Sequence, residues 1–174
     1  VDFPAAEKLI DTAYNNGVNY YDTAYGYHDG RSEVAVGKAL SKYPRDTWYL
    51  ASKFPGYETR AEWKPAEVFE EQLERCGVSY FDFYLLHNVC ESTYPVYIDE
   101  RWKIVEYLFE QKEKGRIRYF GFSAHGQMPV YTEFLERLGH LMEFGQMEIN
   151  ALDWTFQQSK EKYEALVERN IPAW

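Results

Sequence analysis

Four side chains suited to proton chemistry are spaced along the chain, and three of them come at the end of an apolar segment. Asp22 ends GVNYYD, Lys53 lies near the end of TWYLASKF, and His87 ends YFDFYLLH. Tyr27 stands five residues beyond Asp22, in the glycine-bearing loop AYGYHDGRSE. A carboxylate, an ammonium, an imidazole and a phenol are groups with which enzymes transfer protons and orient substrate oxygens.

Lys53 is the most informative of these residues, because an ammonium at the end of an apolar strand is costly to bury without a partner carboxylate. Asp22 can supply that carboxylate. A lysine that stays charged beside a tyrosine lowers a phenol pKa that is otherwise about 10, so Tyr27 becomes a usable proton donor near neutral pH. His87 can donate a hydrogen bond that fixes the direction of a substrate oxygen.

Each of these residues alone also has a structural explanation. A lysine at a strand end usually extends to water, and Tyr21 and Tyr25 of the same region are expected to pack or to line the site. However, four successive strands end in a polar or ionisable group, the fourth being Ser123, and Gln146 and Asn150 are expected on the fifth strand. That repetition is hard to assign to packing.

The elements that must position these residues alternate between strand and helix. The predicted strands are Asn19–Asp22, Tyr49–Lys53, Phe83–Leu86, Arg118–Phe122 and Gln146–Ile149. The predicted helices cover about 4–16, 32–43, 65–75, 98–114, 130–138 and 157–169. Repeating units of roughly 25 to 35 residues are typical of parallel βα units with right-handed crossovers.

An open doubly wound sheet and a closed barrel both fit this alternation. No GxGxxG or GxxxxGK[ST] motif follows a predicted strand, which favours the barrel. A full barrel needs about 250 residues, whereas this chain supplies five strands and the start of a sixth at IPAW. We expect an α/β fold: an incomplete (β/α)8 TIM-type barrel that lacks the first strand and the last strands, with residues 1–174 as one domain. The carboxyl ends of its strands would carry the site.

Composition excludes several classes of function. The formal charge of −9 argues against a nucleic-acid surface, and no segment approaches the roughly 18 apolar residues of a membrane span. The N-terminal VDFPAAEKLIDTAY lacks the features of a secretory signal, so a cytoplasmic location is expected. Cys76 and Cys90 are expected to be reduced thiols. The histidines and cysteines form no zinc set, so no metal is expected.

The segments YYDTAYGYHDGRSEVAVGKAL, ASKFP, YLLHNV and GRIRYFGFSAHG resemble the aldo-keto reductase family, in the same order through essentially the whole chain. The resemblance implies an oxidoreductase that reduces an aldehyde or ketone to an alcohol by hydride transfer from NAD(P)H. It further implies that Tyr27 is the general acid, that Lys53 lowers the pKa of Tyr27, that Asp22 anchors Lys53, and that His87 orients the carbonyl.

The resemblance also implies a nicotinamide site for NADPH or NADH, formed by Asp22, Ser123 and Gln146, with the last two on the carboxamide. The family often has Ser-Asn at the end of the fourth strand, whereas this chain has SAH, which leaves the role of the asparagine to Ala124, His125 or water. Four aromatic residues are candidates for an apolar wall around the substrate, and these are Tyr57, Trp63, Tyr94 and Tyr97.

The segments CGVSYFDFYLLHNV, FSAHG and INALDWTFQQSKEKYE are similar to a bacterial branch whose members often carry a C-terminal ferredoxin-like domain. This similarity suggests an electron-transfer partner. An iron–sulfur cluster would belong to such an extension, because this chain has no cysteine cluster. The oligomeric state is left open.

Two other functions remain open at this stage. The first is a catalytically slow, nicotinamide-binding regulatory or redox-partner subunit on the same fold. Retention of all four candidate catalytic residues weighs against it. The second is a barrel aldolase with Lys53 as a Schiff-base nucleophile, which borohydride trapping without nicotinamide would reveal.

Overall fold

The computed structural model describes residues 1–58 and 60–174. The described residues form a parallel sheet whose strands lie in sequence order: β1 (Tyr20–Asp22), β2 (Tyr49–Phe54), β3 (Phe81–Val89), β4 (Ile117–Ala124) and β5 (Phe144–Gln146). One α-helix, α1 (Phe3–Asn15), precedes the first strand. The α-helices between and after the strands are α2 (Arg31–Leu40), α3 (Pro65–Cys76), α4 (Tyr94–Tyr97), α5 (Ile104–Glu113), α6 (Met128–Leu138), α7 (Asp153–Phe156) and α8 (Ser159–Glu168). Short 3₁₀ turns occupy Arg45–Thr47 and Gly139–Leu141.

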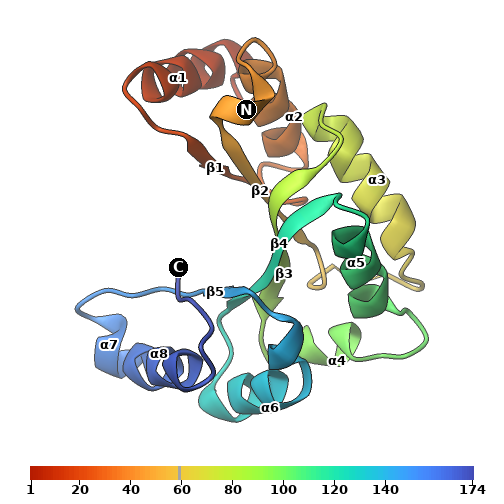
Figure 1. Ribbon diagram of the computed structural model, residues 1–174, viewed down its shortest axis with the longest axis vertical. Helices are drawn as coiled ribbons and strands as arrows, with labels where there is room; N and C mark the ends of the chain where they lie inside the picture. The colour runs from red at the N-terminus through yellow and green to blue at the C-terminus, as the bar shows by residue number, and fades with distance from the viewer. Residues whose placement is uncertain (59) are drawn as a thin grey trace.

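The five strands curve into an arc with the helices on its convex side, and the concave side is open (Figure 1). This arrangement confirms the predicted fold class, a partial TIM-type barrel of parallel strands in sequence order. The expected start of a further strand is also confirmed, because Ala173 forms a parallel bridge with Gly145 beside β5. No helix in the described part of the chain is long and apolar enough to cross a membrane.

The fifth strand was predicted in the wrong place. It covers Phe144–Gln146 rather than Gln146–Ile149, and Phe144 and Gln146 pair with Gly121 and Ser123 of β4. Asn150, which was expected on this strand, instead accepts the backbone N–H groups of Leu152 and Asp153 through its side chain, at 2.9 Å each. Such a local side-chain turn competes with strand pairing and leads the chain into α7.

The prediction of one helix over 98–114 was also wrong. The segment contains the end of α4's turn at Ile98, an irregular stretch, and then α5, which begins at Ile104. Lys103, the residue before α5, has a left-handed backbone with φ of 50°, which a continuous helix does not allow. The remaining predicted helices start or end within a few residues of the observed ones, and the short helices α4 and α7 were not predicted.

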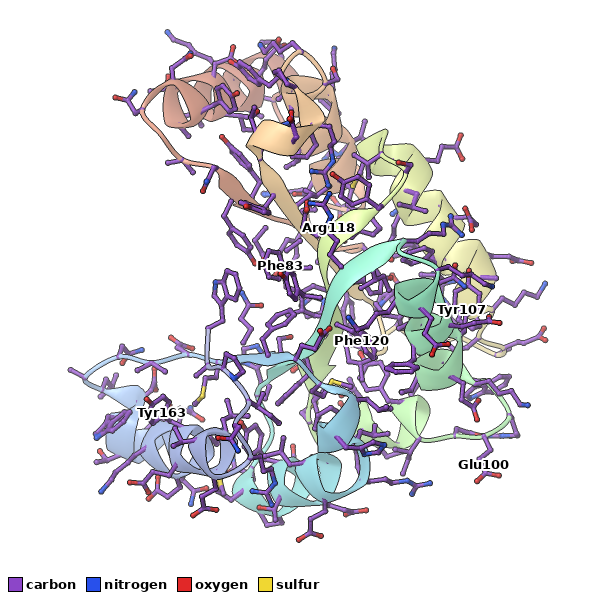
Figure 2. All side chains as sticks on the ribbon, viewed as in Figure 1. Phe83, Glu100, Tyr107, Arg118, Phe120 and Tyr163 are labelled. Carbon is purple, nitrogen blue, oxygen red and sulfur yellow. The ribbon has the colours of Figure 1, made fainter. Side chains whose placement is uncertain are left out.

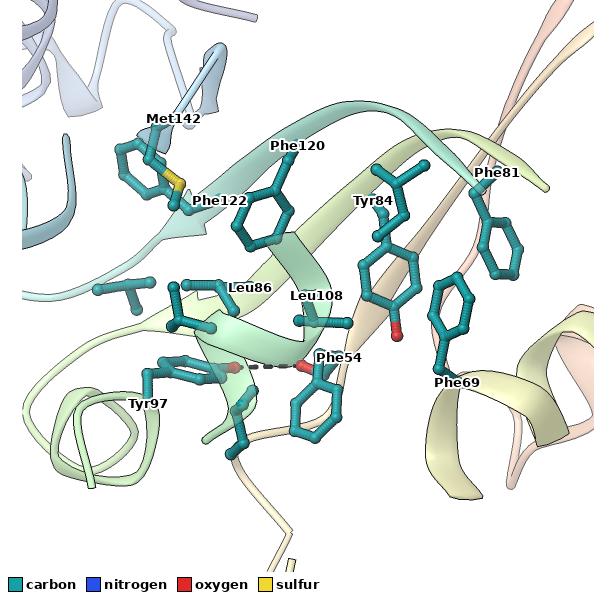
Figure 3. Close-up of a cluster of buried hydrophobic side chains, with 14 of the residues drawn as sticks. Phe54, Phe69, Phe81, Tyr84, Leu86, Tyr97, Leu108, Phe120, Phe122 and Met142 are labelled. Carbon is teal, nitrogen blue, oxygen red and sulfur yellow. Dashed lines mark hydrogen bonds between the residues drawn. The ribbon is translucent and has the colours of Figure 1, made fainter. Parts of the chain in front are cut away.

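Side chains alternate between the two faces of the sheet, as strand geometry requires. On the convex face, aromatic residues such as Tyr84 and Phe120 pack under the helices in the main core (Figure 3). On the concave face, Phe83 packs with Leu85 and Phe144 in a smaller cluster. Figure 2 shows Phe83 directed toward the open side of the arc and Phe120 toward the helices.

This alternation determines where the polar strand ends point. Ala51 and Phe83 are paired across β2 and β3 on the concave face, and Lys53 and Leu85 are the next pair on that face. Lys53 therefore projects to the concave side at the carboxyl end of β2. His87 lies two residues beyond Leu85, so the strand period brings it toward the same side at the end of β3.

Candidate active site

The ammonium of Lys53 lies between the ends of β1 and β2. Its Nζ donates to Asp22 Oδ1 in a short salt bridge and to the backbone carbonyl of Thr23 at 2.9 Å. Only 3% of the Lys53 side chain is exposed, whereas 27% of Asp22 is. The predicted Asp22–Lys53 pair is therefore confirmed as a buried ammonium held by a carboxylate that still reaches solvent.

Tyr27 brings its phenol to this ammonium from the loop after β1. The Tyr27 hydroxyl lies 3.5 Å from Lys53 Nζ, and the ammonium is 4.8 Å from the centre of the tyrosine ring. Left-handed backbone at His28 and Asp29, with φ of 53° and 58°, turns the chain from this loop into α2. Tyr27 is 40% exposed, so its hydroxyl is accessible to a ligand in front of Lys53.

His87 is buried, with 9% of the residue exposed, and its Nδ1 has no hydrogen-bond partner among the described residues. Burial, aided by the charges of Lys53 and His125, lowers the pKa of His87 to about 3. The imidazole is therefore neutral at neutral pH and still has one N–H to donate. Its ring lies edge-to-face against Tyr27 and Tyr57, with centroids 5.6 Å and 5.0 Å apart.

A β-bulge follows His87 and places Ser123. Leu86 pairs with Phe122 and Val89 with Ala124, so β3 has one more residue than β4 in this interval. Asn88, within the bulge, has a φ of 59° and donates its backbone N–H to Ser123 Oγ at 2.8 Å. Because that oxygen acts as an acceptor here, the hydroxyl keeps its own proton for a ligand.

All six residues that the sequence singled out as catalytic or cofactor-binding line one cavity of about 240 Å³ at the carboxyl ends of the strands. Gln146 is among them, with its Nε2 at 3.5 Å from Asp22 Oδ2. The full lining is Asp22, Tyr27, Lys53, His87, Ser123, His125, Gln146, Met147 and Glu148. Convergence at one rim is thus confirmed, and the chemical role of each residue stays a prediction.

The aromatic candidates for a substrate wall are mostly elsewhere. Trp63, Tyr94 and Tyr97 are buried in the core, and Trp63 packs against Phe54. Tyr57 is the exception, because it is partly exposed and contacts His87. Aromatic side chains after a strand end fill the core as readily as they line a site, and sequence does not separate the two outcomes.

Sequence reasoning missed a buried polar network behind Lys53. Glu33 accepts from Ser52 Oγ at 2.6 Å and from Gln72 Nε2 at 2.7 Å, and Gln72 Nε2 also lies 3.1 Å from the Lys53 carbonyl oxygen. Burial raises the pKa of Glu33, although its hydrogen bonds and Arg75 oppose the change. The Ser-Glu pair in GRSEVAVG was a signal for Glu33, but nothing in the sequence marked Gln72.

Comparisons with known proteins agree with this geometry. The model of the Aldo/keto reductase family matches residues 1–173. The NADH-specific methylglyoxal reductase of Escherichia coli is 34% identical in an alignment of 147 positions that covers 73% of this chain and 44% of that protein. An uncharacterized oxidoreductase of Bacillus subtilis, YqkF, is 28% identical in an alignment of 160 positions that covers 86% of this chain and 50% of that protein.

Solved structures show the same fold. An aldo-keto reductase from Bacillus halodurans in its holo form superimposes with a TM-score of 0.74 at 30% identity, over 99% of this chain and 55% of that one. An aldo-keto reductase from Klebsiella pneumoniae in complex with NADPH gives 0.75 at 22% identity, over 98% and 56% of the two chains. The chain spans about half the length of these relatives. It belongs to the aldo/keto reductase family.

Proposed function

We propose that this chain carries the catalytic residues of an NAD(P)H-dependent oxidoreductase that reduces an aldehyde or ketone to an alcohol. The observation that supports this function best is the Lys53 ammonium, which lies between the Asp22 carboxylate and the Tyr27 hydroxyl in a cavity that His87 also lines. Family membership adds support, because the Escherichia coli relative is a methylglyoxal reductase by name.

In the proposed reaction, the Tyr27 hydroxyl donates its proton to the carbonyl oxygen as the carbonyl carbon becomes an alcohol carbon. The Lys53 ammonium stabilises the negative charge that develops on the Tyr27 oxygen, and Asp22 holds the ammonium in place. The neutral His87 imidazole donates a hydrogen bond to the same carbonyl oxygen and orients it. Tyr27 then regains a proton from water through its exposed side.

The residues of the cavity fit a nicotinamide. Ser123 retains a hydroxyl proton, Gln146 presents a primary amide, and His87 Nδ1 is a buried nitrogen without a partner in the described structure. When bound, NADPH or NADH supplies the hydride. Ser123 and Gln146 would hold the carboxamide of the cofactor, and Asp22 would lie beside it.

We further propose the finer features that the sequence suggested. Residues 1–174 form one domain, an incomplete barrel. The protein is cytoplasmic, belongs to the bacterial branch whose members often carry a C-terminal ferredoxin-like domain, and has an electron-transfer partner. The support is the similarity of INALDWTFQQSKEKYE and FSAHG to that branch. Both NADH and NADPH are retained as cofactors, since one relative is named NADH-specific and another structure contains NADPH.

The test is turnover by the purified protein that contains this chain. Methylglyoxal and a panel of simple aldehydes are offered with NADH and with NADPH, and oxidation of the cofactor is followed by absorbance. We expect saturable reduction with at least one cofactor. Tight cofactor binding without turnover of any carbonyl would instead support the regulatory alternative, and borohydride trapping at Lys53 without a nicotinamide requirement would support the aldolase.

A further inference from the structure

Tyr97 contacts the backbone at the ends of both β2 and β3. It is the last residue of α4 and only 2% exposed. Its hydroxyl lies 2.6 Å from the carbonyl oxygen of His87 and 3.1 Å from that of Phe54, the contact drawn in Figure 3. The backbone N–H of Gly56 points at the same hydroxyl oxygen, at 3.1 Å. Tyr97 therefore touches the residue next to Lys53 as well as His87 itself.

The single proton of the Tyr97 hydroxyl determines which of these contacts it donates and which it accepts. A tyrosine hydroxyl has one proton to donate and lone pairs to accept with. The shortest contact assigns the proton to the His87 carbonyl, with the Phe54 carbonyl as the second acceptor. The lone pairs accept the Gly56 N–H, which also lies 3.0 Å from the Phe54 carbonyl. A continuous chain of hydrogen bonds thus runs from the end of β2 to His87.

This bridge lies just beyond the last rung of the ladder between the two strands. The last pair of β2 and β3 is Phe54 with Leu86. After it, β2 ends at Phe54 and the chain turns at Gly56 and Tyr57, while β3 enters the bulge that contains Asn88. The backbone ladder therefore no longer sets the separation of the two strands at the level of His87, which is where the Tyr97 hydroxyl makes its contacts.

We propose that Tyr97 is a positioning residue whose hydroxyl sets the separation between the strand ends that carry Lys53 and His87. The inference rests on the proposed function, in which these two side chains act on one carbonyl oxygen. A misplacement of about 1 Å between such groups is enough to cost roughly 10²-fold in rate. Tyr97 touches neither substrate nor cofactor in this proposal, because it acts through the backbone of its neighbours.

Gly56 provides a second way to disturb the same bridge. A Cβ atom at Gly56 would lie 2.4 Å from Cζ and 2.5 Å from the hydroxyl oxygen of Tyr97. The Tyr97 ring cannot retreat freely, because it is packed in the core. Gly56→Ala should therefore push the Tyr97 hydroxyl away from the Gly56 backbone. Tyr97→Phe instead removes the hydroxyl and keeps the ring.

The first experiment compares Tyr97→Phe with Tyr131→Phe in the protein that contains this chain. Tyr131 is the matched control, because it is equally buried and its hydroxyl contacts the Lys162 carbonyl at 3.3 Å, outside the cavity. With both variants folded, we expect Tyr97→Phe to lower kcat for aldehyde reduction roughly tenfold and to leave the Kd of the cofactor unchanged. A kcat equal to that of Tyr131→Phe would overturn the inference.

A double variant tests whether Tyr97 and Gly56 act through one bridge. If they do, Tyr97→Phe combined with Gly56→Ala should be about as slow as the slower single variant, because the second change has no bridge left to disturb. Rate losses that multiply would mean that the two residues act separately, which contradicts the proposal.

The last experiment does not depend on turnover, so it separates this inference from the proposed function. The rings of Tyr27 and His87 have centroids 5.6 Å apart, close enough for nuclear Overhauser contacts between their protons. We expect these contacts to weaken in Tyr97→Phe and to persist in Tyr131→Phe, even if the wild-type protein reduces no aldehyde. Unchanged contacts in Tyr97→Phe would refute the positioning role whatever the rates.

Discussion

The two rims of the sheet both contain a buried charged group, but the buried polar groups at the two rims differ in how completely they are hydrogen-bonded. At the amino-terminal rim, the Asp82 carboxylate is fully buried and accepts from Arg45 at 2.6 Å, from Arg118 at 2.7 Å and from the Leu50 N–H at 2.9 Å. At the carboxyl-terminal rim, the Lys53 ammonium has partners, but His87 Nδ1 has none within the described ranges.

The surroundings of Asp82 at the amino-terminal rim also differ from those of Lys53 and His87 at the carboxyl-terminal rim. Arg45 and Arg118 lie against the ring of Tyr80, at 4.1 Å and 4.3 Å, and Arg45 also lies 4.2 Å from the Trp48 ring. The Nε atom of Arg45 has no hydrogen-bond partner in the part of the chain that the structure describes. At the carboxyl-terminal rim the Lys53 ammonium also lies over a ring, that of Tyr27, at 4.8 Å, but most side chains around the cavity in front of it are polar. A satisfied buried carboxylate stabilises the fold, whereas unsatisfied groups at a cavity are available to a ligand.

Of the variants that test this difference between the two rims, Tyr27→Phe should show the largest effect, a loss of activity. Removal of a general acid should lower kcat roughly 10² to 10⁴-fold, with cofactor binding nearly unchanged, because the hydroxyl acts mainly in the transition state. The free energy of unfolding should stay the same, since Tyr27 is well exposed.

The matched control for Tyr27→Phe is Tyr25→Phe. The Tyr25 hydroxyl bonds to Glu71 and Arg60 rather than to a residue of the cavity. Steady-state kinetics and cofactor titration measure both variants. Equal losses of kcat in the two variants, or a loss of cofactor binding that matches the loss of rate in Tyr27→Phe, would contradict the proposed acid.

Asp82→Ala should produce the largest loss of stability. It leaves two arginines and a backbone N–H without their shared acceptor, and breaking a buried ion pair typically costs about 3–5 kcal/mol. Because Arg45 and Arg118 are partly exposed and can be hydrated, we expect a value near the lower end of that range. Urea denaturation measures it, and the surface pair of Glu110 and Lys114 gives the control variant Glu110→Ala.

Lys53→Met tests whether the buried charge at the carboxyl-terminal rim lowers the free energy of unfolding. We expect kcat to fall about 10²-fold, whereas the free energy of unfolding should not decrease. The reason is that the substitution removes a buried charge, and the Asp22 carboxylate left behind is partly exposed and can be hydrated. A destabilisation as large as that of Asp82→Ala would show that both rims are built for stability and would remove the contrast between them.

The last expected effect is a gradual one, the dependence of stability on pH that His87 contributes. Burial lowers the pKa of folded His87 to about 3, while in an unfolded chain the value is about 6.5. Between these two values the unfolded chain binds a proton that the folded chain does not. Stability therefore falls as the pH falls through this range, by at most about 1.4 kcal/mol per pH unit.

His87→Gln should remove this contribution and make the stability of the protein less sensitive to acid. Urea denaturation at several pH values between neutrality and mild acid gives the slopes. The control is His140→Gln, because His140 is exposed. If both variants keep the wild-type slope, His87 is not held neutral by its surroundings.

Much of the fold followed from local patterns in the sequence. The first four predicted strands, and the helices that alternate with them, rest on the periodicity of apolar residues, which depends on neighbouring residues alone. The errors fall where local signals are weak. The fifth strand is three residues long, and the chain after it is redirected by the side chain of Asn150. The segment after Tyr97 was expected to be helical, but Lys103 interrupts it with a left-handed backbone.

Most of the candidate site could also be predicted. Asp22, Lys53 and His87 each end an apolar strand, and parallel strands bring their carboxyl ends to one rim. The sequence therefore determined by itself the order of the strands, the rim that carries the polar residues and the identity of those residues.

Tertiary structure alone decided which buried groups support that rim. Tyr97 reaches the carbonyl of Phe54, 43 positions away in the chain, and Arg45 reaches Asp82 across 37 positions. Such contacts depend on the curvature of the sheet, the register of its strands and the bulge at Asn88. The physical reason is that local periodicity specifies which face a side chain occupies, whereas a hydrogen-bond partner is specified to within a few tenths of an ångström by the packing of distant segments.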